Sequence, residues 1–176
     1  MPIGKRLAEL LGMSYGIEFD LDRPFWSLDG ATTFPAIFRA LRNLLPEGSI
    51  LYLEGGTPDA NLRRFFRDHA MATRQRVDRA WLRPAAVSVP ATPDNLESLA
   101  VMGEHLAEPE LCIHFHVYRG DRVLLSWHDA FTQPMLLSGD LPEAKVREFA
   151  QAVGMVPQAV VNMEPGDPLH NRGSSP

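Results

Sequence analysis

The sequence predicts an α/β fold: one domain in which a mixed β-sheet is covered by about four helices. Three observations support this class. Segments with strand periodicity alternate with segments of helical periodicity through most of the chain. Such alternation implies crossover connections and parallel strand pairs, whereas a hairpin late in the chain adds antiparallel ones. Finally, 176 residues, 45% of them hydrophobic, are enough to build a single core.

The first strand is expected within residues 15–22, where apolar and acidic side chains alternate. This period of two puts the apolar side chains on a covered face and the carboxylates of Glu18, Asp20 and Asp22 on the other. Three acids in line can bind a divalent cation, or they can discourage pairing at an exposed sheet edge. Because acids spaced about 7 Å apart do not by themselves form a cage, we expect an edge strand.

A helix is predicted next, over residues 34–45, where apolar side chains keep helical spacing. Thr32 or Thr33 can cap its start, and Pro35 suits its first turn. The run Ile50–Leu53 that follows is almost wholly apolar, as expected for a central strand covered on both faces.

Two later helices are each expected to start with the same three residues. These are Thr57-Pro58-Asp59 and Thr92-Pro93-Asp94, and in each the threonine is the predicted N-cap. Between these helices, residues 71–83 fit a helix and a strand equally well, and residues 85–89 read as a short buried strand.

The stretch from Glu110 to Phe131 is the most strand-like in the chain. Its two apolar runs predict an antiparallel hairpin over residues 111–129, with the turn at Gly120-Asp121. A short strand over 134–138 and a helix closed by Gly154 follow, which completes a single domain at residues 1–156. Residues 157–176 lose all periodicity and are predicted to form a mobile tail rich in proline and glycine.

Composition limits the classes of function. The single cysteine, Cys112, excludes an internal disulfide framework and a cysteine-based zinc site. The first residues do not resemble a signal peptide, and no run approaches the roughly 20 apolar residues of a membrane span. We therefore expect a soluble, cytoplasmic protein. Nucleophile elbows, C-x-x-C and H-E-x-x-H motifs are all absent from the sequence.

Two histidines on the hairpin form the clearest chemical signal. His114 and His116 share a strand face, with Cα atoms about 7 Å apart, so their imidazoles can converge on one metal ion. A plain two-residue turn makes Asp129 the third ligand, whereas a β-bulge would bring His128 to that face instead. The alternative is that both rings pack against the facing strand. We expect packing and no cofactor, with zinc or another transition metal as the alternative.

A glycine pair after the second predicted strand is a further candidate. Gly55, Gly56 and Thr57 lie where a strand ends and a helix begins, and backbone N–H groups there can bind an anion. No nucleotide-binding motif accompanies them, so ordinary turn glycines are the expected explanation.

A basic segment interrupts a chain whose net charge is −5. Residues 63–83 contain seven arginines and two aspartates, which usually means a solvated face but also suits docking of an acidic protein. The predicted partner surface consists of Arg63, Arg64, Arg67, Arg74, Arg76 and Arg79.

The function expected from these observations is a non-enzymatic module that binds a macromolecule, with an acidic protein as the partner. Neither nucleic-acid binding nor membrane binding is indicated, and the oligomeric state is left open. The alternative is a metal-dependent hydrolase that uses the His114-x-His116 motif, with an open metal position for water.

Overall fold

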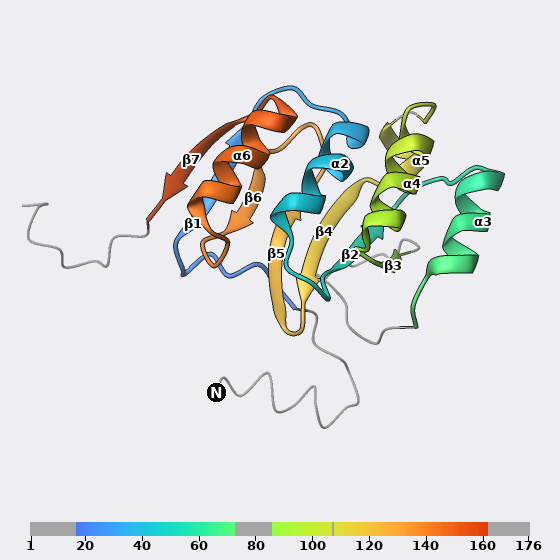
Figure 1. Ribbon diagram of the computed structural model, residues 1–176, viewed down its shortest axis with the longest axis horizontal. Helices are drawn as coiled ribbons and strands as arrows, with labels where there is room; N and C mark the ends of the chain where they lie inside the picture. Colours follow the sequence, from blue (N-terminus) through green and yellow to red (C-terminus); the bar gives the residue numbers. More distant parts are fainter. Residues whose placement is uncertain (1–16, 73–85, 107, 162–176) are drawn as a thin grey trace, which may run out of the picture.

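The computed structural model describes residues 17–72, 86–106 and 108–161, which form a sheet with helices in front of it (Figure 1). Seven strands make one sheet in the order β3-β2-β4-β5-β6-β1-β7. Every neighbouring pair is antiparallel. The strands are β1 (Phe25–Asp29), β2 (Ile50–Glu54), β3 (Ala86–Pro90), β4 (His114–Arg119), β5 (Arg122–Trp127), β6 (Met135–Ser138) and β7 (Val156–Val160).

Four helices of ten or eleven residues and one single-turn helix accompany this sheet in the described ranges. They are α2 (Phe34–Leu44), α3 (Ala60–His69), α4 (Pro93–Gly103), α5 (Glu108–Leu111) and α6 (Glu143–Val153). In Figure 1, α2 runs between α6 and α4, and α3 lies at the far side of α4, at the end of the molecule where β3 is the edge strand. None of the described helices is long and apolar enough to cross a membrane.

The main core fills the space between the helices and one face of the sheet. Phe38 of α2 is fully buried, and its ring meets that of Phe115 of β4 edge to face, with centroids 5.6 Å apart. Phe34 stacks on Phe38 at 5.8 Å and makes an edge contact with Trp127 of β5 at 6.2 Å. Such aromatic pairs contribute about 0.5–1.5 kcal/mol each beyond the area they bury. Because α2 joins these rings, it is the helix that fastens the helical layer to the sheet.

The opposite face of the sheet carries a smaller apolar cluster. Tyr52, Tyr118 and Val123 are buried there, and Ile17 and Phe19 pack against them. The prediction of a strand over residues 15–22 is therefore wrong for its described part, since only Ile17 makes an isolated bridge. The alternation there reflects apolar side chains that turn toward this cluster without a ladder of backbone hydrogen bonds.

The α/β class is confirmed, but the prediction of a mixed sheet with parallel pairs is wrong. A helical crossover does join strands that run in the same direction: β1 to β2 through α2, β3 to β4 through α4 and α5, and β6 to β7 through α6. In every case at least one antiparallel strand lies between the two, so they never pair. The prediction failed because it took strands joined by a crossover to be neighbours.

Several local predictions are confirmed by the way elements begin and end. Thr33 accepts a hydrogen bond from the Ala36 backbone N–H at the start of α2, and Thr92 does the same for Asn95 in α4. Gly154 ends α6 in the left-handed conformation, with φ 74°.

Other boundaries need correction. Asp59, rather than Thr57, caps α3, accepting a hydrogen bond from the Leu62 backbone N–H at 2.7 Å. β1 was not anticipated. The predicted tail starts too early, because β7 spans Val156–Val160 and pairs with β1. The rest of that predicted tail, residues 162–176, lies outside the described residues, as do residues 73–85, so these predictions stay as they were.

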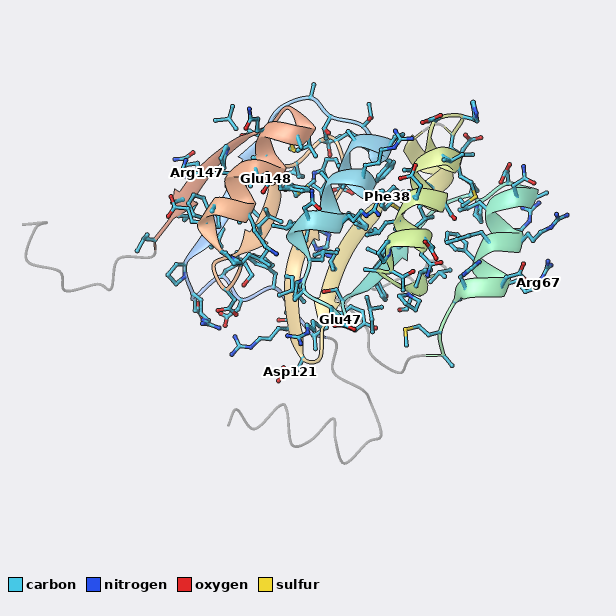
Figure 2. All side chains as sticks on the ribbon, viewed as in Figure 1. Phe38, Glu47, Arg67, Asp121, Arg147 and Glu148 are labelled. Atoms are coloured by element: carbon cyan, nitrogen blue, oxygen red, sulfur yellow. The ribbon has the colours of Figure 1, made fainter. Side chains whose placement is uncertain are left out.

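The central position of Phe38 leads to a testable expectation for stability (Figure 2). Phe38→Ala should lower the free energy of unfolding by about 3–5 kcal/mol, because it removes a fully buried ring and leaves a cavity. Denaturant unfolding followed by circular dichroism measures this. Val101→Ala on α4, where the side chain is 48% exposed, is the control and should change stability by about 0.5 kcal/mol or less. Equal losses in the two variants would contradict the described packing of α2.

Candidate functional site

A β-bulge in the hairpin decides which side chains share the face opposite the helices. Tyr118 pairs with Val123 but Val117 pairs with Leu125, so Leu124 is an extra residue in β5. His116 consequently lies opposite Ser126 rather than opposite Leu125. The register expected from a plain two-residue turn is therefore wrong, and the bulged alternative is the one that the structure contains.

Three imidazoles come together on this face, and we call His114, His116 and His128 the imidazole cluster. The ring of His128 contacts both others: its centroid lies 5.1 Å from that of His114 and 4.9 Å from that of His116. Both contacts are edge-to-face. His116 is almost completely buried, the side chain of His114 is 24% exposed, and His128 is exposed. The cluster thus runs from the interior of the sheet to solvent.

Polar residues of the two neighbouring strands surround the cluster. Ser126 Oγ lies 3.1 Å from Nδ1 of His116, within hydrogen-bond distance. On the other side, β2 places Tyr52 opposite His116 and Glu54 opposite His114. Glu54 is only 5% exposed, and its carboxylate makes no hydrogen bond or ion pair with any residue that the structure describes. A carboxylate is rarely buried in this way without a partner.

The loop after β5 fixes the orientation of His114. The backbone N–H of Asp129 donates to Nδ1 of His114 at 3.1 Å, so the proton of the neutral ring is on Nε2. The carboxylate of the same aspartate lies 3.8 Å from Nδ1, and its side chain is 60% exposed. Asp129 and Phe131 both have positive φ, 40° and 72°. For a bulky residue such as Phe131 this is a strained conformation, which its packing against Phe34 holds in place.

The structure brings together His114, His116 and His128 and places Asp129 beside the first of them. Within the described ranges, however, no group of three or more His, Cys, Asp or Glu side chains is arranged to hold a metal ion. The predicted set of metal ligands therefore stays a prediction. Cys112 is buried, and burial raises the pKa of its thiol, so it is not a reactive thiolate at neutral pH.

Sequence reasoning missed Tyr52, Glu54 and Ser126 as neighbours of the cluster. Glu54 was visible as the one acid at the end of an apolar strand, and such a residue is a signal for a buried polar group. Its pairing with His114 was not visible, because α3, β3, α4 and α5 lie between β2 and β4 in the sequence.

The glycine pair after β2 has a steric explanation. A Cβ on Gly56 would lie 2.2 Å from the backbone oxygen of Leu111, and Gly55 has a positive φ of 82°. The chain is this close because the Ile113 N–H donates to the Glu54 carbonyl at 2.8 Å. The start of α3 already holds the carboxylate of Asp59, which disfavours a second anion. The arrangement thus favours turn glycines, and the predicted anion site at Gly55, Gly56 and Thr57 gains no support.

The arginine face, which we define as Arg63, Arg64 and Arg67, lies on the exposed side of α3, opposite buried Leu62, Phe65 and Phe66. Figure 2 shows Arg67 pointing away from the molecule. Arg63 donates to the Pro58 carbonyl, and Arg67 forms an ion pair with Asp68 at 3.4 Å. Arg64 makes no side-chain hydrogen bond or ion pair with the residues described. The other predicted members, Arg74, Arg76 and Arg79, lie outside the described residues.

A polar groove of about 750 Å³ lies between residues 18–24, the tip of the hairpin and the turn after β6. Two arginines neutralise part of its acidic lining: Arg23 binds Asp140 through both terminal nitrogens, at 2.8 and 3.1 Å, and Arg122 lies 3.7 Å from it. The acids that were expected to line a strand edge therefore line this groove instead. Its carboxylates are Glu18, Asp20, Asp22, Asp121 and Asp140.

Comparison of this chain with protein-family models, with curated proteins and with solved structures finds no match. The site therefore has to be interpreted from its own geometry.

The burial of the imidazole cluster predicts unequal effects of two histidine substitutions. His116→Ala should lower the free energy of unfolding by about 1–3 kcal/mol, because it removes a buried ring and leaves Ser126 without this partner. His128→Ala removes an exposed ring and should cost about 0.5 kcal/mol or less. Thermal or denaturant unfolding at neutral pH measures both. A larger loss for the exposed residue would contradict the described gradient of burial.

The close approach at Gly56 predicts a second pair of stability changes. Gly56→Ala should destabilise the protein by about 1–3 kcal/mol, because the new methyl group meets backbone atoms that cannot easily move. Gly103→Ala is the control, since its Cβ would have ordinary contacts starting at 3.4 Å and alanine favours a helix. Unfolding curves of the two variants should separate clearly. A neutral Gly56→Ala would show that this turn is looser than described.

Proposed function

We propose that this protein is a non-enzymatic binding module that recognises an acidic protein partner through the arginine face of α3. The observation that carries the proposal is the division of this helix into two sides. One side is buried through Leu62, Phe65 and Phe66, and the other presents three guanidinium groups to solvent.

The chemistry of arginine supports a protein partner. A guanidinium group offers a planar fork of N–H donors that matches a carboxylate, and arginine is enriched in protein interfaces. Around these arginines the only described ion pair is that of Arg67 with its sequence neighbour Asp68, and both side chains are largely exposed, at 70% and 53%. Such a pair is weak and is easily exchanged for a carboxylate of another protein.

The position of α3 also supports the proposal. The helix lies at one end of the molecule, beside the edge strand β3, where a partner can approach without meeting α2 or α6 (Figure 1). Because the chain as a whole has a net charge of −5, this local positive surface contrasts with the rest of the protein. An acidic partner would therefore be directed toward α3.

The proposal predicts how a charge reversal acts on binding. Labelled poly-L-glutamate serves as the acidic polypeptide, and its binding is followed by fluorescence anisotropy. The triple variant Arg63→Glu, Arg64→Glu, Arg67→Glu should bind about tenfold more weakly or worse, since each exposed pair contributes up to about 1 kcal/mol. Binding by the unchanged protein should also weaken as salt shortens the screening length to about 3 Å at 1 M.

Arg42→Glu on α2 is the matched control, because Arg42 is also an exposed helical arginine and the charge change is of the same kind. It should retain most of the binding. Equal losses for one Arg42 reversal and for the α3 triple variant would show that only net charge matters. Binding that is insensitive to salt would likewise overturn the proposal.

A further inference from the structure

The imidazole cluster contains a pair of histidines that face each other across the hairpin. Phe115 pairs with Trp127 in the bulged register, so the next residues outward are His114 and His128. Their ring centroids lie 5.1 Å apart. Imidazoles that approach across two strands can bind the same metal ion once each turns a nitrogen toward it. A set of two protein ligands is smaller than the groups of three or more that are absent from the described residues.

The carboxylate of Glu54 is an independent observation that points to a cation at this place. Glu54 lies opposite His114 in the ladder between β2 and β4, it is only 5% exposed, and no described residue pairs with its carboxylate. Buried charges are normally paired or coordinate a metal ion. A cation held by the neighbouring imidazoles would supply the charge that Glu54 lacks.

We propose that His114 and His128 form a two-imidazole site for a divalent transition-metal ion, with Glu54 as the neighbouring negative charge. The remaining coordination positions would be filled by water. This site is separate from the arginine face, and it does not depend on the function proposed for α3.

Asp129 acts in this site as a positioning residue. His114 would bind the metal through Nε2, which requires the ring proton to move to Nδ1. In that tautomer Nδ1 no longer accepts the hydrogen bond from the Asp129 backbone N–H, and it can instead donate to the carboxylate of the same residue, now 3.8 Å away. The exposed side chain of Asp129 has room to turn toward it. Carboxylates commonly orient metal-binding histidines in this way.

The test uses the full chain without a histidine tag and titrates it with Cu²⁺, Ni²⁺, Zn²⁺ and Mg²⁺ by isothermal titration calorimetry. One equivalent of Cu²⁺ should bind most tightly, Ni²⁺ and Zn²⁺ more weakly, and Mg²⁺ not measurably, because imidazole favours the later transition metals. His114→Ala and His128→Ala should each abolish this binding step. Asp129→Asn should weaken it by about 10- to 100-fold without abolishing it.

His69→Ala and His105→Ala are the matched controls, since both histidines are exposed and lie outside the cluster. They should leave the titration unchanged, and circular dichroism of every variant checks that the fold is retained. The copper complex of the unchanged protein gives a second readout, because its electron paramagnetic resonance spectrum should show nitrogen coupling. Absence of a one-equivalent step, absence of nitrogen coupling, or equal losses in the control variants would overturn the proposal.

Discussion

One extra residue in the hairpin determines how the two faces of the sheet are used. With Leu124 as a bulge, Leu125 and Trp127 turn toward the helices and Ser126 turns away from them. A plain register would reverse these assignments and place a serine in the aromatic core. The apolar demand of the core therefore stabilises the bulge, and the bulge in turn gathers the polar side chains on the opposite face. The imidazole cluster is a consequence of how the core packs.

The two faces of the sheet have different physical characters as a result. On the helix side, Phe38, Phe115 and Trp127 belong to one continuous apolar core. On the other side, the aromatic rings of Tyr52 and Tyr118 share their strands or neighbouring ones with buried polar groups, namely His116, Ser126 and Glu54. Burying polar groups is unfavourable unless each has a partner. The partners on this face are therefore the feature that links its stability to any ligand it binds.

The arginine face and the imidazole cluster belong to different parts of the fold, so they can work independently. The arginines depend only on the amphipathic character of α3, whose apolar side is buried. The cluster depends on long-range pairing of β2, β4 and β5 and on the strained loop at Asp129 and Phe131. A local surface tolerates substitutions around it, whereas a site assembled from three strands is sensitive to changes anywhere in the sheet.

The sequence by itself determined the elements whose signals are local. Helical periodicity and a threonine cap located α2, and alternation with a glycine turn located the hairpin, because these features act between residues close in the chain. Strand order was decided only by tertiary structure, since it depends on which strands insert between two that a helix connects. The same holds for the cluster: His114 and His116 were recognisable, but the bulge at Leu124 and the pairing of Glu54 with His114 come from packing between distant segments.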